Sequence, residues 1–150
     1  MVAADYVCVG PDGNPAATVA FCAWGQSSLA SASARVAGQM IGGVVGYTLL
    51  RAAVEHFGLP FLGPAIAEGT TLGAALASEG IANFLLMLAT CCFALTRVGE
   101  TYLLKQPLIA ASIRAIICLC GASGPAINPM LATSYHMVNT GEWPDARHWL

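Results

Sequence analysis

The chain has 150 residues, of which 57% are hydrophobic and only 9% are charged, and its formal net charge is -2. A soluble globular domain carries about 25% charged residues, so this composition excludes an ordinary soluble protein and indicates a multi-pass integral membrane protein with the lipid bilayer as its main partner. The 6 Lys and Arg residues are scattered along the chain. This excludes the clustered basic face that nucleic-acid binding requires, so we expect no nucleic acid as a partner.

The residues that usually carry chemistry are also sparse. Four cysteines, Cys91, Cys92, Cys118 and Cys120, lie inside apolar segments, and no Cys-x-x-Cys pair with a matching histidine occurs in the sequence. We interpret them as small hydrophobic residues rather than as disulfides or metal ligands. The sequence has no Ser/His/Asp set with supporting motifs and no nucleotide loop. We therefore expect neither an enzyme nor a metal or cofactor site.

The first predicted element is a short helix over residues 14–24. It begins at Asn14-Pro15, and Asn ahead of Pro is typical of a helix start, because Asn caps exposed N–H groups and Pro in the first turn loses no hydrogen bond. The apolar run that follows is about ten residues long, whereas a helix that crosses a bilayer needs about 20. We predict a half-helix that enters the membrane without crossing it.

Three longer apolar segments come next, and we predict that each forms a transmembrane helix. Their ranges are 33–53, 72–95 and 107–121. In the first of them, Gly38, Gly42 and Gly46 recur at four-residue spacing. Small residues at this spacing allow another helix to approach closely in a membrane, so we expect this face to pack against a neighbouring helix.

Each predicted span carries a polar residue that needs an explanation: Gln39 in the first, Glu79 in the second and Arg114 in the third. Charges inside a membrane are costly and are usually paired or functional. We interpret all three residues as structural support and expect Arg114 to pair with Glu79 or with a backbone carbonyl. A pore-lining role for Arg114 is the alternative.

A second Asn-Pro pair, Asn128-Pro129, follows an irregular Gly/Ser/Pro-containing stretch and opens another short apolar run, predicted as a half-helix over residues 128–138. Such a lead-in must be buried in protein or line a water-filled cavity. If the two half-helices enter from opposite faces, their positive ends converge, and the amides of Asn14 and Asn128 can donate to a solute oxygen. Converging positive ends also oppose cations and protons. The alternative is that Asn-Pro merely marks two turns.

Here the sequence resembles a known family. Gly13-Asn14-Pro15-Ala16 and Asn128-Pro129-Met130 resemble the two signature loops of the aquaporin, or major intrinsic protein, superfamily. Glu79 is similar to a fourth-span glutamate of that family that supports the second loop, and Gln39 is similar to part of its third span. The resemblance implies a homotetramer with one pore in each protomer. It also implies that the pore and solute-orienting residues are Asn14, Pro15, Ala16, Asn128, Pro129 and Met130.

Residues 123–129 are most similar to the small basic intrinsic proteins and superaquaporins, which implies an intracellular membrane such as the endoplasmic reticulum. The departures from the family pattern concern the selectivity filter. The expected filter residues are Ile116, Pro125 and Leu131, where many water channels have a histidine at the first position and an arginine at the third. An apolar filter replaces few of the hydrogen bonds that water gives up. It would therefore favour glycerol-like solutes or peroxide.

The sequence thus predicts an all-α membrane protein with three transmembrane helices and two re-entrant half-helices. Aligned with the family, it lacks the first, second and sixth spans, so we expect a partial aquaporin-like bundle, apparently a fragment. The predicted function is passive passage of water or small neutral solutes. Two alternatives stay open, namely a truncated membrane fragment that does not conduct and a structural membrane protein that associates through its glycine face.

Overall fold

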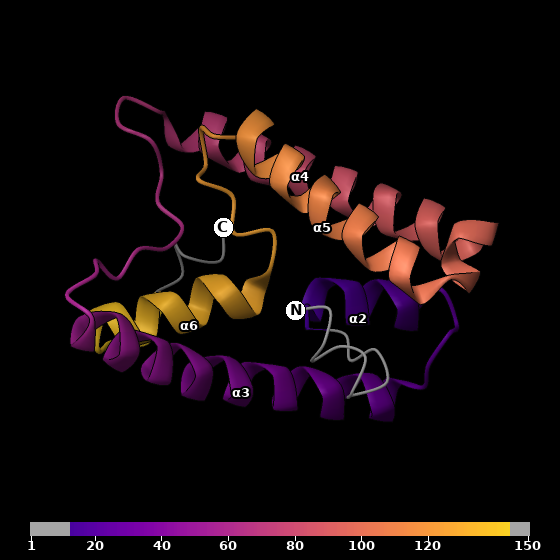
Figure 1. Cartoon of the computed structure of the whole chain (residues 1–150), viewed down its shortest axis with the longest axis horizontal. Coiled ribbons are helices and arrows are strands. Elements are labelled where there is room, and N and C mark those ends of the chain that lie inside the picture. Colours follow the sequence, from indigo (N-terminus) through magenta and orange to yellow (C-terminus); the bar gives the residue numbers. More distant parts are fainter. Residues whose placement is uncertain (1–12, 145–150) are drawn as a thin grey trace. The chain divides into compact units, whose positions relative to one another are not determined.

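The structure is a computed structural model that describes residues 13–144. These residues contain helices and no strand, so the all-α prediction is confirmed for them. Figure 1 shows the elements in chain order. They are α2 (Pro15–Ala23), α3 (Leu29–His56), α4 (Leu72–Leu95), the 3-10 helix η1 (Arg97–Glu100), α5 (Tyr102–Leu119) and α6 (Pro129–Thr140).

Local capping signals explain where most of these helices begin. Helix α3 begins at Leu29, before the predicted residue 33, because the side chain of Ser28 caps it and accepts a hydrogen bond from the N–H of Ser31 at 3.2 Å. Helix α4 has the predicted range. Helix α5 begins at Tyr102, so Pro107 lies inside the helix instead of opening it. Proline inside a helix removes one backbone hydrogen bond.

The described residues form two compact units. One consists of residues 65–127 and contains α4, η1 and α5; we call it the α4–α5 unit. The other consists of residues 13–64 and 128–144 and contains α2, α3 and α6; we call it the α2–α3–α6 unit.

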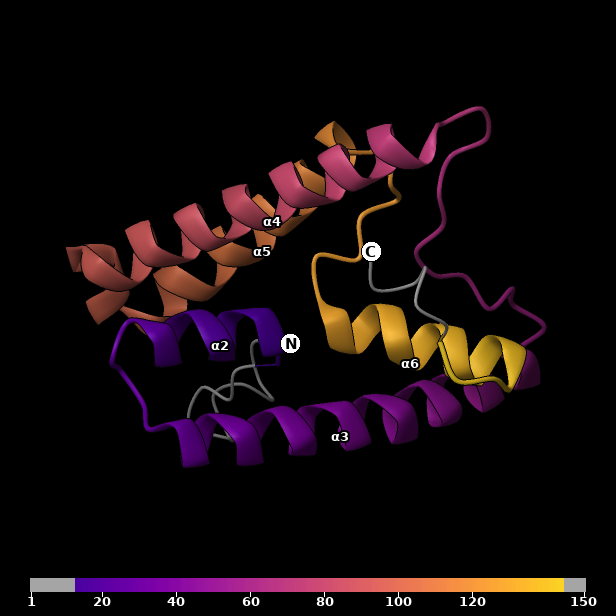
Figure 2. The same cartoon turned by 180° about the vertical axis from the view of Figure 1, so that it is seen from behind.

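In the α4–α5 unit the two long helices lie side by side, as both Figure 1 and Figure 2 show. Buried side chains between them form its core: Ala82, Leu86, Ile116, Cys120 and Ile127. The C-terminal end of α5 is fastened to α4 by a hydroxyl, because Ser78 Oγ donates to the carbonyl of Cys120 at 3.0 Å. This contact satisfies one of the carbonyls that a helix end leaves without an intrahelical partner.

In the α2–α3–α6 unit both short helices pack on α3. The closest approach to α6 is at Gly43, where a Cβ atom would overlap the side chains of Met130 and Ser134. No described atom lies within 4 Å of the place where a Cβ would stand on Gly38, Gly42 or Gly46. Within this unit the packing glycine is therefore Gly43, and the predicted glycine face is open.

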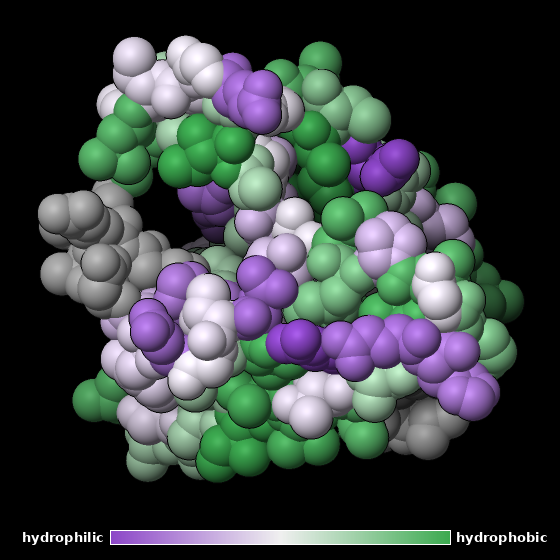
Figure 3. All heavy atoms as spheres, turned by 90° about the vertical axis from the view of Figure 1, so that its left-hand side faces the viewer, coloured by the Kyte–Doolittle hydropathy of each residue, from purple (hydrophilic) through white to green (hydrophobic). Residues whose placement is uncertain are grey.

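Within residues 13–144, two helices are long and apolar enough to cross a membrane: residues Leu72–Phe93 of α4 and Tyr102–Leu119 of α5. Only 11% and 6% of these two stretches are buried, so neither is the enclosed core helix of a soluble protein. Large apolar side chains such as Phe84 (67% exposed) and Leu119 (79% exposed) point outward. On the face that Figure 3 presents, hydrophobic residues, drawn in green, lie beside hydrophilic residues drawn in purple. Exposed apolar surface of this extent suits a lipid environment.

Candidate functional site

The two short helices begin in the same way. The side chain of Asn14 caps α2, its Oδ1 accepting a hydrogen bond from the N–H of Ala16 at 2.9 Å. The side chain of Asn128 caps α6, its Oδ1 accepting from the N–H of Met130 at 3.0 Å. Each cap has an extended backbone and is followed by a proline in the first turn. Both Asn-Pro pairs are therefore true helix starts and not isolated turns.

These two helix starts meet. The side-chain amide of Asn128 donates a hydrogen bond from Nδ2 to the carbonyl oxygen of Gly13 at 2.8 Å. In Figures 1 and 2, α2 and α6 run along α3 in opposite directions from this point. The positive ends of both helix dipoles therefore face one region of the α2–α3–α6 unit.

The bond to Gly13 changes what the amide of Asn128 can do. A carboxamide nitrogen carries two N–H donors, and its oxygen is a separate acceptor. In Asn128 the oxygen holds the helix cap and one N–H holds the Gly13 carbonyl. The side chain is thereby fixed at two atoms, which leaves its second N–H in a set direction.

The first half-helix is supported by a chain of hydrogen bonds from α3. Gln39 Nε2 donates to the hydroxyl of Thr18 at 2.8 Å, and this hydroxyl donates to the backbone carbonyl of Asn14 at 3.2 Å. Thr18 is buried, with 2% of its surface exposed. Gln39 was expected from the sequence to be a support residue, whereas Thr18 was missed. Its position four residues after Asn14 is the signal that could have found it.

The lead-in to the second half-helix is held by Glu79 inside the α4–α5 unit. Its Oε1 accepts a hydrogen bond from the backbone N–H of Ile127 at 2.8 Å, and Asn83 Nδ2 donates to the same oxygen at 3.2 Å. Ile127 has a φ of 51°, a left-handed conformation that is rare for a β-branched residue. Glu79 thus contacts the backbone at a strained residue directly before the cap residue Asn128.

Arg114 does not make the ion pair that the sequence suggested. Among the described residues the partners of the Glu79 carboxylate are Asn83 and Ile127, and Arg114 is exposed on α5. The backbone N–H of Ile127 donates to the carboxylate that Arg114 was expected to contact. A carboxylate oxygen can accept hydrogen bonds from neutral N–H donors such as these without a cation beside it.

The three expected filter residues are divided between the two units. Ile116 is buried in the core between α4 and α5, and Pro125 is buried in the stretch after α5. Leu131 is half-buried on α6, in the other unit. Their joint role as a selectivity filter therefore stays a prediction.

Met130, which stands where the first Asn-Pro motif has Ala16, is accommodated by α3. Its side chain and that of Ser134 occupy the space that a Cβ on Gly43 would fill. A larger residue in the signature is thus matched by the smallest residue on the facing helix. Within residues 13–144 no group of three His, Cys, Asp or Glu side chains is placed to hold a metal ion.

Comparison with known proteins gives one family. The family model described as Major intrinsic protein matches residues 3–150. No curated protein and no solved structure matches the chain.

Proposed function

The chain belongs to the major intrinsic protein family, whose members are membrane channels and not enzymes, and from this premise we propose that it passes water and small neutral solutes, such as glycerol or hydrogen peroxide, by passive diffusion. As a member of this family with two apolar helices of spanning length, it is an integral membrane protein. We further propose that Asn14 and Asn128 are the donors that orient the solute. Pro15, Ala16, Pro129 and Met130 form the first turns that hold these two side chains.

The hydrogen bond between Asn128 and Gly13 is the observation that carries this proposal. It joins the N-terminal ends of α2 and α6. We therefore propose that the side-chain amides of Asn14 and Asn128 and the positive ends of the two helix dipoles act on the same solute. A neutral solute oxygen accepts hydrogen bonds there, and a cation or proton is repelled by the same partial charges. Because Asn128 is fixed at two atoms, little reorganisation is needed when the solute arrives.

The solute class follows from the proposed filter. Ile116, Pro125 and Leu131 offer no side-chain hydrogen bond, so a water molecule that passes them gives up partners without replacement. A solute with carbon atoms loses less, because apolar walls suit its apolar part. We therefore propose that the ratio of glycerol to water permeability is high for a member of this family.

Several finer features belong to the same proposal. Helix α3, at 28 residues, is long enough to be a third transmembrane helix beside α4 and α5. The open face of Gly38, Gly42 and Gly46 then packs against a further membrane helix. By the resemblance of residues 123–129, we propose the small basic intrinsic protein or superaquaporin branch, a homotetramer and an intracellular membrane such as the endoplasmic reticulum.

The same open glycine face supports a second candidate, a structural membrane protein that associates through α3 and does not conduct. One assay separates the two. The purified chain is inserted in lipid vesicles, and shrinkage and reswelling are followed by stopped-flow light scattering with water and with glycerol. The channel proposal expects both rates to exceed those of protein-free vesicles. Equal rates, with insertion verified by flotation, would support the structural candidate.

A further inference from the structure

The C-terminal end of α6 has a carbonyl that its own helix does not satisfy. A helix leaves its last carbonyls without intrahelical N–H partners. Here Gly141 N donates to the carbonyl of Met137 at 2.8 Å, whereas Glu142 N, which would continue the ladder to Val138, donates to the hydroxyl of Thr140 at 3.1 Å. The carbonyl of Val138 is therefore left to a donor from elsewhere.

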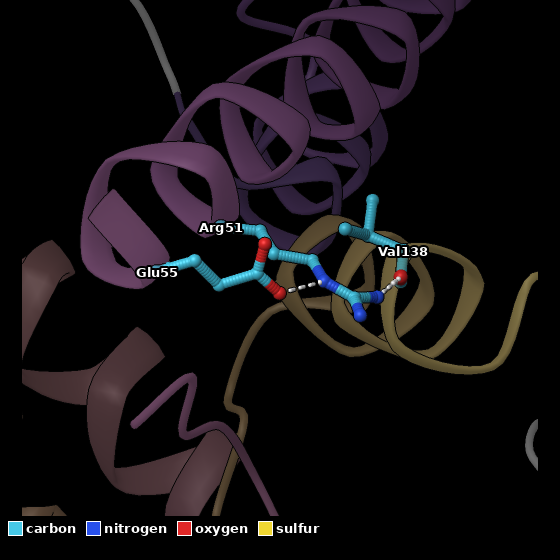
Figure 4. Close-up of polar contacts among 3 residues, drawn as sticks. All are labelled: Arg51, Glu55 and Val138. Atoms are coloured by element: carbon cyan, nitrogen blue, oxygen red, sulfur yellow. Dashed lines mark hydrogen bonds and ion pairs between the residues drawn. The ribbon is translucent and has the colours of Figure 1, made fainter. Parts of the chain in front are cut away.

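That donor is Arg51 on α3. Its Nη1 donates to the carbonyl oxygen of Val138 at 2.5 Å, as Figure 4 shows. The positive guanidinium stands at the negative end of the α6 dipole, where a cation is stabilised. A hydrogen bond from a charged donor is also stronger than one between neutral groups. Arg51 thus connects α3 to the end of α6 that lies farthest from Asn128.

The guanidinium is itself held in place. Its Nε donates to Glu55 Oε1 at 2.8 Å, one turn along α3, and its central carbon lies 5.9 Å from the ring centroid of Phe61. The two side chains of the ion pair are 40% and 56% exposed, so the pair by itself adds little stability. The ion pair instead orients the side chain of Arg51, because the planar guanidinium uses one nitrogen for Glu55 and another for Val138. A lysine has a single nitrogen and cannot hold both partners in this geometry.

Aromatic rings extend the contact toward α6. The ring of Phe61 lies 5.2 Å from that of Tyr135, and the ring of Tyr47 lies 6.1 Å from Phe61 and 6.2 Å from Tyr135. Tyr135 is one turn before Val138 on α6. A Cβ on Gly63 would overlap Tyr135, so the segment after α3 also presses on this helix. The C-terminal half of α6 is therefore fixed by rings and by a charge together.

From these contacts we propose that Arg51 is a positioning residue for the second half-helix, and through it for Asn128; this rests on the channel function proposed above. Helix α6 has 12 residues and is about 18 Å long, and it moves as a rigid rod. Its N-terminal end is held by Asn128 on Gly13, and its C-terminal end by Arg51. When Arg51 no longer binds the C-terminal end, helix α6 can tilt. The tilt turns the side-chain amide of Asn128 away from the direction that its two hydrogen bonds set.

The test compares Arg51→Met with Arg51→Lys and with a control on the same helix at an exposed position, Leu49→Met, all in vesicles with equal inserted protein. For Arg51→Met we expect a fall in water permeability of about tenfold, comparable to the loss of one charge-assisted hydrogen bond. Because the amide is misdirected and not lost, we also expect the ratio of glycerol to water permeability to change. Arg51→Lys is expected to fall between Arg51→Met and the unmodified chain, and Leu49→Met is expected to stay at the unmodified level. Unchanged permeability and ratio in Arg51→Met would overturn the proposal.

A second measurement keeps this inference separate from the channel function. Spin labels are placed on α3 at Ala52 and on α6 at Asn139, both exposed, in a background without the native cysteines. We expect the distance distribution to broaden in Arg51→Met and to stay narrow in Leu49→Met. If the unmodified chain conducts nothing but this broadening occurs, the channel function fails and the anchoring role of Arg51 stands. A narrow distribution in Arg51→Met would reject the anchoring role even if the chain conducts.

Discussion

The carboxylate of Glu79 accepts a hydrogen bond from the backbone N–H of Ile127 at 2.8 Å, one residue before the cap of the second half-helix. The side chain of Ile127 is buried, with 3% of its surface exposed, and its backbone is left-handed with a φ of 51°. A buried N–H without an acceptor costs about as much as the net gain of one or two hydrogen bonds. Glu79 therefore stabilises a conformation that Ile127 would not adopt alone.

We expect Glu79→Leu to lower the free energy of unfolding by about 1–3 kcal/mol, because the N–H of Ile127 then loses the carboxylate oxygen to which it donates. Glu79→Gln keeps an oxygen in place and is the matched control, so its loss is expected to be smaller. Thermal unfolding in detergent, followed by circular dichroism, measures both. Equal stability of the leucine variant and the unmodified chain would remove the supporting role of Glu79.

Gly124 lies in the same lead-in, with a φ of 55°, and a Cβ there would overlap the backbone of Ala65. A left-handed conformation costs an L-residue about 1–2 kcal/mol, and forced overlap in a packed region adds about 1–3 kcal/mol. We therefore expect Gly124→Ala to be strongly destabilising. Gly121→Ala, three residues earlier, is the control, because nothing lies within 4 Å of its Cβ position. The account of this turn fails if the two variants unfold at the same temperature.

The contact of α3 with α6 gives a double-mutant test. Gly43→Ala places a methyl group on the side chain of Met130, and we expect it to displace α6 and reduce permeability. Adding Met130→Ala makes room for that methyl group, so the double variant is expected to recover part of the loss. Gly42→Ala, with open space at its Cβ, is expected to change nothing within this unit. Additive losses from Gly43→Ala and Met130→Ala would show that the two positions do not contact each other.

Thr18 gives a similar test for the first half-helix. Thr18→Val removes the hydroxyl that accepts from Gln39 and donates to the carbonyl of Asn14, and it does so in a buried place. We expect a loss of about 1–3 kcal/mol in the free energy of unfolding. Thr18→Ser keeps the hydroxyl and is expected to lose less. If valine is tolerated as well as serine, the hydroxyl does not hold α2 to α3.

The sequence predicted the short helices well because their start signals are local. Asn14 and Asn128 cap the helices that follow them, as Asn-Pro indicated. Pro107 misled the prediction of where the third long helix begins. The helix begins at Tyr102, so the five residues before the proline are already helical. The sequence shows a proline but not whether the preceding turn is stabilised by neighbours.

Packing was harder to predict than capping. Gly38, Gly42 and Gly46 have the spacing of a packing face, yet α6 lies against Gly43, one residue away from that pattern. Which side of a glycine-rich helix is covered depends on the facing helix, and here the side chains of Met130 and Ser134 lie at Gly43. The bond of Gln39 to Thr18 and the bond of Arg51 to Val138 join residues 21 and 87 positions apart in the chain, and no local pattern reveals these two contacts.

The most direct test of the central claim replaces Asn14 and Asn128 by aspartate. Aspartate caps a helix as well as asparagine does, but its carboxylate has no N–H to donate. We expect Asn14→Asp and Asn128→Asp each to keep the helical content of the inserted chain. We also expect each to bring stopped-flow water and glycerol permeability down toward the level of protein-free vesicles. Permeability that stays at the unmodified level in both variants would contradict the claim that these two amides orient the solute.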